Sequence, residues 1–399
     1  MNSDKAFAGH HVLAELRGVD SKRLDDAPFL QEALSKSLTA AGATVCDLIA
    51  HQFEPQGVTV LALLAESHAS IHTYPELGSA FVDVFTCGAS ADPQHAARLL
   101  ADALGAESVA TRVVERGPAQ VRTVTESVGT GLTRSWNLTD VLFEADTDFQ
   151  HVVIGRTAQG ISLFCDDERQ STDATQLIYH EALMVPALLL AEQVRRVLII
   201  GSSEGVASQI AVAAGAERVD HVDIDKQAVQ ACAEYLPYGY SPADLDATDG
   251  PTRIHYRDGF EFIAEAAAAG DRYDVVVIDL PDENDDPAAQ HNRLYGKEFL
   301  QRSAEILSEG GVLACQAGCP TVWRNDTLRK AWERFNETFG TVAYYGSDEH
   351  EWAFLFARVD VVADPTDRMI SRLSTATYRP ATVDPLALRG GSVPPHSLR

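Results

Sequence analysis

The sequence predicts an α+β sandwich followed by a small β domain and an α/β Rossmann-like domain. The chain has 399 residues, more than one ordinary hydrophobic core needs, so it suits two or three domains. Residues 9–105 mix strand-like and helix-like patterns, which is typical of helices packed on one face of an antiparallel sheet. From residue 195 onward, apolar strands alternate with helices, which is typical of a doubly wound, mainly parallel sheet.

The first domain is expected to span residues 1–106. Val, Leu and Phe are dense in HHVLAELRG, VTVLALLAES and SAFVDVFTCG, which predicts strands there. The spacing of apolar residues predicts helices over 28–43 and 93–106. Residues 107–142 lack a clear period and are rich in Ser, Thr and Arg, so we expect a linker with an entry strand.

The rest of the chain is expected to hold a small β-strand domain over 143–175 and a Rossmann-like domain over 176–364. Short strands with turns indicate the small β-strand domain, and a helix from about 174 to 193 begins the Rossmann-like domain. Its strands are predicted in RRVLIIGSSEG, VDHVDID, DVVVIDLPD and GGVLACQAG. Residues 365–399 carry scattered Pro and Arg and are expected to form a loosely packed tail.

The amino-acid composition excludes some classes of binding partner. Lys and Arg number 32 against 58 Asp and Glu, a formal net charge of −26, which argues against nucleic acid and anionic membranes and suits cationic small molecules. We see no signal peptide and no apolar run of about 18 residues, so we expect a cytoplasmic protein. The six cysteines form no CxxC pair, so no metal site and no disulfide scaffold are expected.

A first chemical centre is predicted in residues 57–88. Ser67, His68, Ser70 and His72 are expected in a turn between two strands, with Cys87 at the end of the next strand. A hydroxyl, an imidazole and a thiol together can support nucleophilic and proton-transfer chemistry. Alternatives are a turn with local hydrogen bonds and a buried Cys, or a Ser–His hydrolase, although no GxSxG elbow is present.

The segments ESHASIHTYPE and DVFTCG resemble the short S-adenosylmethionine decarboxylase proenzymes of bacteria and archaea, over about residues 8–105. The resemblance implies that the hydroxyl of Ser67 attacks the carbonyl of Glu66 and forms an ester. Elimination and hydrolysis then leave a pyruvoyl group at position 67. This group takes the place of pyridoxal phosphate by forming a Schiff base that delocalises the carbanion left by decarboxylation.

The same resemblance implies roles for other residues. His72 would promote self-processing, and Cys87 would protonate the α-carbon after carbon dioxide leaves. Phe53 and Tyr74 would sandwich the adenine, and Glu76 would lie near the ribose.

Two features keep an alternative open. Thr59-Val60 stands where the family usually has Ser-Gly. Relatives that decarboxylate arginine or ornithine keep the same Ser, His and Cys, so a pyruvoyl-dependent arginine or ornithine decarboxylase is the main rival.

A second chemical centre is predicted at the carboxyl edge of the parallel sheet. IIGSSEG follows a strand as nucleotide-binding loops do, and Asp223 follows about twenty residues later, where an acid can bind ribose hydroxyls. Asp258, Asp279 and Asp282 also follow strand or turn signals, which would give an acidic crevice. The alternative is a set of solvated loop acids in an acidic chain.

This half resembles the spermidine synthase (aminopropyltransferase) family, which implies a methyltransferase-type fold. The matching segments, in family order, are DFQ, YHEALMVPAL, VLIIGSSEG, VDIDKQAV, YRDGFEF, VVVIDLPD, LYGKEF, GGVLACQAG and EWAF. The resemblance implies that Asp223 holds the ribose, Asp258 lies near the adenine and Glu204 helps to hold the aminopropyl donor. Asp279 and Asp282 would occupy the DxxD positions, with Asp282 as the base.

The remaining implied pocket residues are Gln150, Tyr179, His180, Gly201 and Trp352. The family's GGGDGG is GSSEGV here, and Glu204 is one methylene longer than the usual Asp. A non-catalytic nucleoside-binding domain is therefore a second alternative, and two inert structural domains a third.

We therefore expect a bifunctional enzyme of polyamine biosynthesis. The first domain would convert S-adenosylmethionine to decarboxylated S-adenosylmethionine. The second would transfer its aminopropyl group to putrescine or another polyamine. By analogy with both families, a homo-oligomer is expected.

Overall fold

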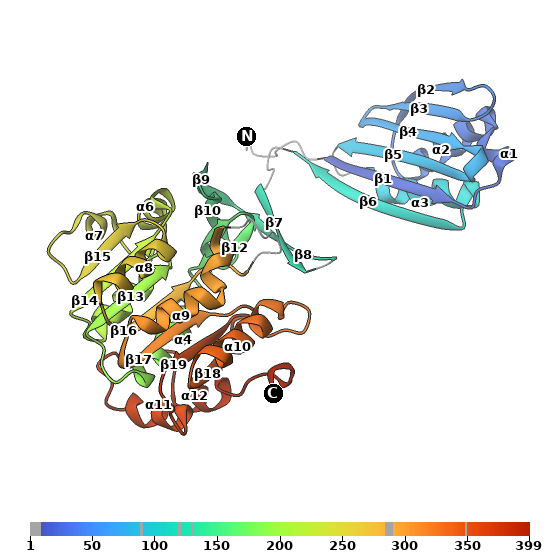
Figure 1. Ribbon diagram of the computed structural model, residues 1–399. Helices are drawn as coiled ribbons and strands as arrows, with labels where there is room; N and C mark the ends of the chain where they lie inside the picture. Colours follow the sequence, from blue (N-terminus) through green and yellow to red (C-terminus); the bar gives the residue numbers. More distant parts are fainter. Residues whose placement is uncertain (1–8, 88–90, 118–121, 130, 284–289, 348) are drawn as a thin grey trace. The chain divides into compact units, whose positions relative to one another are not determined.

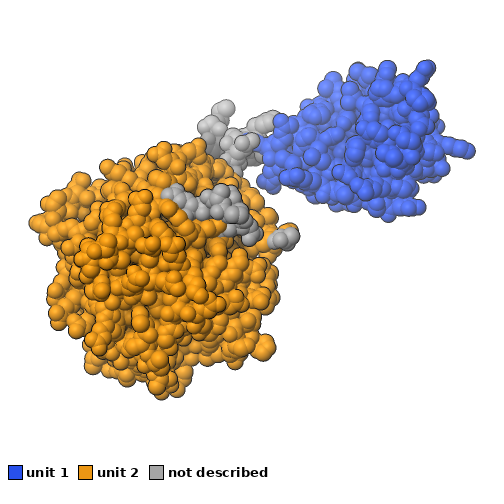
Figure 2. Space-filling model, in the orientation of Figure 1, with its two compact units in different colours: residues 1–120 blue, residues 121–399 orange. Residues whose placement is uncertain are grey.

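The computed structural model describes residues 9–87, 91–117, 122–129, 131–283, 290–347 and 349–399. The chain divides into two compact units, residues 1–120 and residues 121–399, which Figure 2 distinguishes by colour. No helix in the described part of the chain is long and apolar enough to cross a membrane.

Unit 1 is built on a six-stranded antiparallel sheet with the order β2-β3-β4-β5-β1-β6. Its strands are β1 (Gly9–Arg17), β2 (Val45–Gln52), β3 (Val58–Leu64), β4 (Ser67–Tyr74), β5 (Ser79–Cys87) and β6 (Ser108–Arg116). Along β3, β4 and β5, buried Val, Ala and Ile alternate with more exposed residues, as expected where only one face of a sheet is covered.

The helices of unit 1 are α1 (Ser21–Leu24), α2 (Ala27–Ala40) and α3 (Pro93–Leu104), with a 3-10 turn η1 (Pro75–Leu77). Asp26 and Asp92 cap α2 and α3 by accepting hydrogen bonds from backbone N–H groups. Both helices pack their apolar sides on the same face of the sheet (Figure 1). The opposite face of the sheet carries no helix among the described residues.

Two expectations for unit 1 are wrong. Ser67, His68, Ser70 and His72 lie in strand β4 rather than in a turn, and only Ala65 and Glu66 connect β3 to β4. Most of the expected linker over 107–142 is strand instead, because β6 pairs with β1 and completes the sheet of unit 1, and residues 122–129 and 132–138 also form strands. In both segments, polar residues alternate with apolar ones, which suits an exposed strand as well as a loop.

Unit 2 begins with strands rather than with the expected linker. The strands β7 (Arg122–Gly129) and β8 (Leu132–Leu138) form a two-stranded sheet. A four-stranded sheet follows with the order β12-β11-β10-β9. It contains β9 (Asp140–Asp146), β10 (His151–Thr157), β11 (Gly160–Cys165) and β12 (Glu168–Thr172). The small β region is therefore larger than residues 143–175.

The core of unit 2 is a seven-stranded sheet with the order β15-β14-β13-β16-β17-β19-β18. Its strands are β13 (Arg196–Gly201), β14 (Arg218–Asp223), β15 (Thr252–Tyr256), β16 (Tyr273–Asp279), β17 (Leu307–Gln316), β18 (Thr341–Gly346) and β19 (Ala353–Arg358). Five of them are parallel and β19 runs antiparallel to β17 and β18. The predicted doubly wound, mainly parallel sheet is confirmed.

Helices cover both faces of this sheet (Figure 1). One face packs against α4 (Gln176–Leu190), α5 (Val206–Ala213), α11 (Pro365–Leu373) and α12 (Pro385–Gly391). The other packs against α8 (Gly259–Ala269), α9 (Lys297–Glu305) and α10 (Asp326–Thr338). The remaining elements are α6 (Lys226–Tyr235), α7 (Pro242–Asp246), η2 (Gln290–Tyr295) and η3 (His396–Leu398).

Residues 365–399 are not a loosely packed tail. Met369 on α11 and Leu388 on α12 are fully buried in the core that α4 forms with the sheet. The carboxylate of Glu181 on α4 accepts hydrogen bonds from the hydroxyl of Tyr378 and the backbone N–H groups of Ala381 and Thr382, at 2.6–2.8 Å. The C-terminal segment therefore belongs to the folded unit.

Candidate active sites

The Glu66–Ser67 peptide bond lies at the start of β4, where β5 ends beside it. The backbone N–H of Cys87 donates a hydrogen bond to the carbonyl oxygen of Glu66 at 3.2 Å. The Glu66 carboxylate accepts hydrogen bonds from the backbone N–H and the hydroxyl of Thr44, both at 3.0 Å. The backbone hydrogen bond from Thr44 lowers the pKa of Glu66. These contacts hold Glu66 in place and leave its carbonyl carbon beside the hydroxyl of Ser67.

The surroundings of the Glu66–Ser67 bond suit a cofactor that is made from the chain itself. The N–H of Cys87 points at the oxygen that becomes negative when the Glu66 carbonyl is attacked, which is how preorganised donors stabilise such a charge. The hydroxyl of Ser67 lies 3.2 Å from Nδ1 of His68, a neighbour that can accept its proton.

Three predicted side chains of unit 1 meet on the uncovered face of the sheet. The His72 ring lies 5.7 Å from the ring of Phe53 and 4.8 Å from the ring of Tyr74, measured between centroids. Nδ1 of His72 is 2.5 Å from the hydroxyl of Thr59 on the neighbouring strand. Thr59 therefore fixes the orientation of the imidazole.

Glu76 lies apart from these rings, in η1. It accepts a hydrogen bond from the Gln56 amide at 3.1 Å.

The structure does not bring Ser67 and His72 together within one chain. Both lie on β4, five residues apart, which corresponds to roughly 16 Å along a strand. They also alternate in direction, because Ala69 and Ile71 face the helices while Ser70 and His72 face the uncovered side. The expectation that they share a turn fails for this reason.

Unit 2 contains a cavity of about 830 Å³ at the carboxyl ends of β13, β14 and β16. Parallel strands end at one edge, so their last residues meet there. The predicted residues that line the cavity are Gln150, Tyr179, Gly201, Glu204, Asp223, Asp258, Asp279, Asp282 and Trp352. His180 does not line it, because its ring is buried in α4 and Nδ1 is 2.7 Å from the carbonyl of Gln176.

The loop between β13 and α5 is shaped by close backbone contacts. A Cβ on Gly201 would lie 2.0 Å from the carbonyl oxygen of Asp279, and a Cβ on Gly205 would lie 2.2 Å from the ring of Tyr240. Both glycines have φ near +80°. The glycines are therefore needed for packing within the protein, in addition to the approach of a ligand.

The ribose position predicted at Asp223 is enclosed and acidic. Asp223 accepts hydrogen bonds from the Ser203 hydroxyl at 2.7 Å and from the backbone N–H of Asp225 at 2.8 Å. Burial raises the pKa of Asp223 to about 6, and the nearby carboxylates of Asp225 and Glu204 act in the same direction. The amide of Gln150 donates to Asp225 at 3.0 Å. Asp225 also lines the cavity and was missed, although it stands two residues after Asp223.

Asp279 is the last residue of β16 and lines the cavity. Its Oδ1 accepts a hydrogen bond from the hydroxyl of Tyr179 at 2.5 Å. Burial raises the pKa of Asp279, and burial beside that carboxylate raises the pKa of Tyr179 well above its usual range. Asp258 has a structural role as well, because it caps α8 and forms an ion pair with Arg293.

Asp282 has different neighbours. Its Oδ1 accepts a hydrogen bond from the Gln316 amide at 2.9 Å, and its Oδ2 lies 3.5 Å from Nε of Arg324. Burial raises its pKa, while Gln316 and Arg324 oppose that shift. Arg324 and Gln316 both line the cavity and were missed by the sequence analysis. Gln316 lies within the matching segment GGVLACQAG but was not singled out, and Arg324 lies outside every matching segment.

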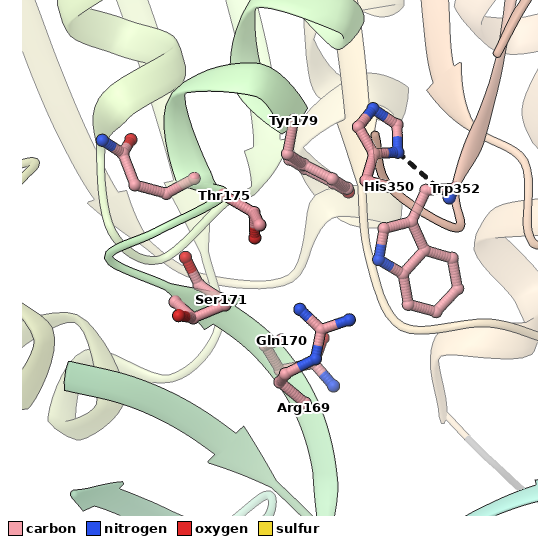
Figure 3. Close-up of a pocket in the computed structure, with 9 residues that line it drawn as sticks. Arg169, Gln170, Ser171, Thr175, Tyr179, His350 and Trp352 are labelled. Atoms are coloured by element: carbon pink, nitrogen blue, oxygen red, sulfur yellow. Dashed lines mark hydrogen bonds between the residues drawn. The ribbon is translucent and has the colours of Figure 1, made fainter. Parts of the chain in front are cut away.

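A small cavity of about 10 Å³ adjoins Tyr179 and Trp352 (Figure 3). In its wall, Nδ1 of His350 accepts a hydrogen bond from the backbone N–H of Trp352 at 3.1 Å. This contact fixes Trp352, which also faces the large cavity.

The two sites differ in the chemistry that they can carry. Unit 1 offers a hydroxyl, a thiol and the imidazole of His68 around one peptide bond. Unit 2 offers an enclosed, acidic cavity suited to a cationic nucleoside and an amine. No cluster of three or more His, Cys, Asp or Glu that could hold a metal ion occurs among the residues that the structure describes.

The comparisons with known proteins assign each unit to a class of enzyme. The family model described as S-adenosylmethionine decarboxylase matches residues 10–117, and the model described as spermine/spermidine synthase domain matches residues 176–346. A crystal structure of spermidine synthase in complex with the transition state analogue AdoDATO has a TM-score of 0.62 at 20% identity, covering 70% of this chain and 94% of that one. The spermidine synthase of Thermotoga maritima gives 0.61, also at 20% identity, with the same coverage. The likeness to these structures shows the fold.

The curated relatives match unit 1 more closely. The S-adenosylmethionine decarboxylase proenzyme of Parasynechococcus marenigrum is 52% identical over 110 residues, which are 28% of this chain and 86% of that protein. The proenzyme of Caldanaerobacter subterraneus is 43% identical over 109 residues, 27% of this chain and 88% of that protein.

The chain therefore belongs to the S-adenosylmethionine decarboxylase proenzyme family, and it carries a spermidine synthase domain behind that proenzyme. It is a bifunctional fusion of two enzymes of polyamine biosynthesis, and membership in the proenzyme family implies a pyruvoyl group made by self-cleavage. The arginine or ornithine decarboxylase alternative is not favoured.

Proposed function

We propose that unit 1 decarboxylates S-adenosylmethionine with a pyruvoyl group formed from Ser67, and that unit 2 transfers the aminopropyl group of the product to an amine. The observation that carries the proposal is the position of the Glu66–Ser67 bond, whose carbonyl oxygen accepts the N–H of Cys87 at 3.2 Å. The acidic cavity of unit 2 supports the second half, because donor and acceptor are both cations.

Self-processing begins when Oγ of Ser67 attacks the carbonyl carbon of Glu66. The C–N bond breaks, an ester forms, and elimination followed by hydrolysis leaves the ketone and releases ammonia. The N–H of Cys87 stabilises the negative oxygen during the attack, and His68, 3.2 Å from Oγ of Ser67, is placed to take its proton.

The pyruvoyl group supplies a ketone that withdraws electrons from the bound substrate when carbon dioxide leaves. Cys87, at the end of β5 beside position 67, is the proposed donor of the proton that the α-carbon then takes up. Phe53 and Tyr74, whose rings flank His72, are the proposed contacts of the adenine, and Glu76 remains the proposed contact of the ribose.

In unit 2, the attacking amine must lose a proton before it can act as a nucleophile, and a carboxylate must accept that proton. The sequence assigned this role to Asp282. Burial raises the pKa of both carboxylates, but the surroundings of Asp279 support the role more strongly, because Tyr179 holds it at 2.5 Å and Arg324 lies beside Asp282 instead. Arg324 partly neutralises Asp282, which is a better contact for the distal part of the acceptor.

Intact-mass analysis of the purified protein tests the first half of the proposal. We expect two chains that divide between Glu66 and Ser67, with the larger one blocked at its N-terminus. Incubation with S-adenosylmethionine, arginine or ornithine should release carbon dioxide from the first alone. Supplied decarboxylated S-adenosylmethionine and putrescine should yield spermidine and methylthioadenosine. A chain that stays intact would overturn the first half, and absence of product would overturn the second.

We further propose that the protein is a homodimer through the uncovered face of the sheet of unit 1. Large apolar side chains are exposed on that face, among them Ile49 at 62% and Leu63 at 59%. Monomers rarely expose so large an apolar surface. His72 lies on that same face, so a second copy would also cover its imidazole.

Co-expression of Ser67→Ala and His72→Gln chains tests this arrangement. Each variant alone should stay uncleaved. Together, the His72→Gln chain should be cleaved only if an imidazole of the other copy reaches its Ser67 around the end of the sheet. Leu61→Asp should yield a monomer by sedimentation, whereas Leu132→Asp in unit 2 should not.

A cytoplasmic location stays a prediction.

A further inference from the structure

The cavity of unit 2 contains a guanidinium where the proposed reaction brings only cations. Arg324 lines the cavity together with Asp282, Gln316 and Trp352. Its side chain is 11% exposed. A buried cation beside the site of a diamine would repel that substrate, so Arg324 needs an explanation that the proposed reaction does not give.

The contacts of Arg324 leave its charge incompletely paired. Nε lies 3.5 Å from Asp282 and Nη2 lies 3.9 Å from Glu168, both longer than ordinary charge-assisted hydrogen bonds. The guanidinium carbon stacks 5.0 Å from the centroid of the Trp352 ring, which fixes its plane. Nη1 is buried and has no hydrogen-bond partner among the described residues.

A buried N–H without a partner is costly, and most such groups in proteins are satisfied. A carboxylate matches the planar fork of a guanidinium with two parallel hydrogen bonds, as a phosphate does. The two nearby acids do not supply that match, since Asp282 is engaged by Gln316 at 2.9 Å and Glu168 lies beyond hydrogen-bond distance. Arg324 lines the cavity with only long contacts to Asp282 and Glu168, so an anionic oxygen of a ligand would complete the pairing of its charge.

We propose that the acceptor site of unit 2 takes a diamine that also bears a carboxylate, with that carboxylate bound by Arg324. The α-ammonium of such a diamino acid would lie at Asp282, and its terminal amine would reach toward Asp279 and Tyr179. This rests on the proposed aminopropyl transfer and names the substrate class of the same cavity.

The reaction balances as it does for a simple diamine. The terminal nitrogen forms a bond to the carbon of the aminopropyl group, and the bond from that carbon to sulfur breaks. Methylthioadenosine leaves with the electron pair of that bond. The proton lost by the nitrogen goes to Asp279, and the carboxylate at Arg324 is unchanged.

Putrescine and L-ornithine form a matched pair of probes, because ornithine is putrescine with one added carboxylate. We would measure kcat/KM for both acceptors with supplied decarboxylated S-adenosylmethionine, in the full-length protein, in Arg324→Gln and in Arg329→Gln. Arg329 is exposed on α10 and gives the same change in charge as a control. Calorimetric binding of each probe in the presence of methylthioadenosine is the second readout.

We expect the unsubstituted protein and Arg329→Gln to bind and use ornithine. Arg324→Gln should lower kcat/KM and affinity for ornithine about 10- to 100-fold more than those for putrescine, since a charge-assisted hydrogen bond to the added carboxylate is lost. Transfer to putrescine with neither binding nor transfer of ornithine would overturn this inference and leave the proposed function standing. Equal losses for both probes would show a merely structural Arg324. Loss of transfer to every acceptor, with ornithine still bound through Arg324, would overturn the proposed function alone.

Discussion

The two units arrange their reactive side chains in opposite ways. In unit 2, acids far apart in the chain meet in one cavity, because parallel strands β13, β14 and β16 end at the same edge. In unit 1, the reactive groups are spread along antiparallel strands, and Ser67 and His72 lie roughly 16 Å apart on one of them. The first topology brings the residues of a site together within one chain, whereas the second leaves Ser67 and His72 apart.

The largest effect is expected from Ser67→Ala, which breaks unit 1 and spares unit 2. Without the hydroxyl, no ester forms, so the chain should remain intact and decarboxylation should be lost completely. Aminopropyl transfer from supplied donor should persist. Ser70→Ala, which removes a hydroxyl bonded to Asp83 at 3.2 Å, is the matched control and should still be cleaved. Intact mass and carbon dioxide release measure both, and cleavage of Ser67→Ala would contradict the mechanism.

The converse change is Asp279→Asn, which should break unit 2 and spare unit 1. Loss of the proton acceptor should lower the rate of aminopropyl transfer about 10²- to 10⁴-fold. Asp282→Asn should raise KM more than it lowers kcat, because we place Asp282 at the distal part of the acceptor. Steady-state kinetics with supplied donor separate the two, and a larger loss of kcat in Asp282→Asn would return the base to that residue.

A smaller effect on unit 1 is expected from Thr59→Val. The hydroxyl of Thr59 lies 2.5 Å from Nδ1 of His72, and its loss should leave the imidazole free to rotate. One hydrogen bond contributes about 1 kcal/mol, so self-cleavage should slow about 5- to 10-fold. A time course of cleavage measures this. Thr59→Ser keeps the hydroxyl and should restore the rate, and an unchanged rate in Thr59→Val would exclude a positioning role.

The smallest effect is expected from a change of pH on the affinity of unit 2 for methylthioadenosine. Burial raises the pKa of Asp223 to about 6, so its ionised fraction, which accepts ribose hydroxyls, falls as the pH drops through that value. Affinity for methylthioadenosine should fall about fourfold from pH 7 to pH 5.5. Between the usual value of 3.8 and about 6, the folded unit binds this proton more tightly than the unfolded chain, so the contribution of Asp223 to stability rises on acidification. As the pH falls, calorimetry should therefore show a lower affinity for methylthioadenosine and a larger contribution of Asp223 to the free energy of unfolding. Asp223→Asn should remove the dependence of the affinity on pH over this range.

The sequence predicted unit 2 better than unit 1 for a physical reason. Buried parallel strands followed by Gly201 and Asp223 leave a strong pattern, because burial and loop geometry restrict those positions. Strands β4 and β6 lie where one or both sides are exposed, so their alternation of polar and apolar residues was taken for a turn and a linker. Arg324 was missed because its position depends on packing against Trp352 from another segment.

The anchoring of Glu181 limits how the chain can be shortened. Its carboxylate is 1% exposed, and Tyr378, Ala381 and Thr382 supply its hydrogen bonds. A fragment that stops at the end of β19 would lose these hydrogen bonds together with the buried side chains of Met369 and Leu388, so we expect it to be destabilised. Expression of the transferase part on its own should therefore retain these final residues, and a fused tag is better attached beyond Arg399 than in place of them.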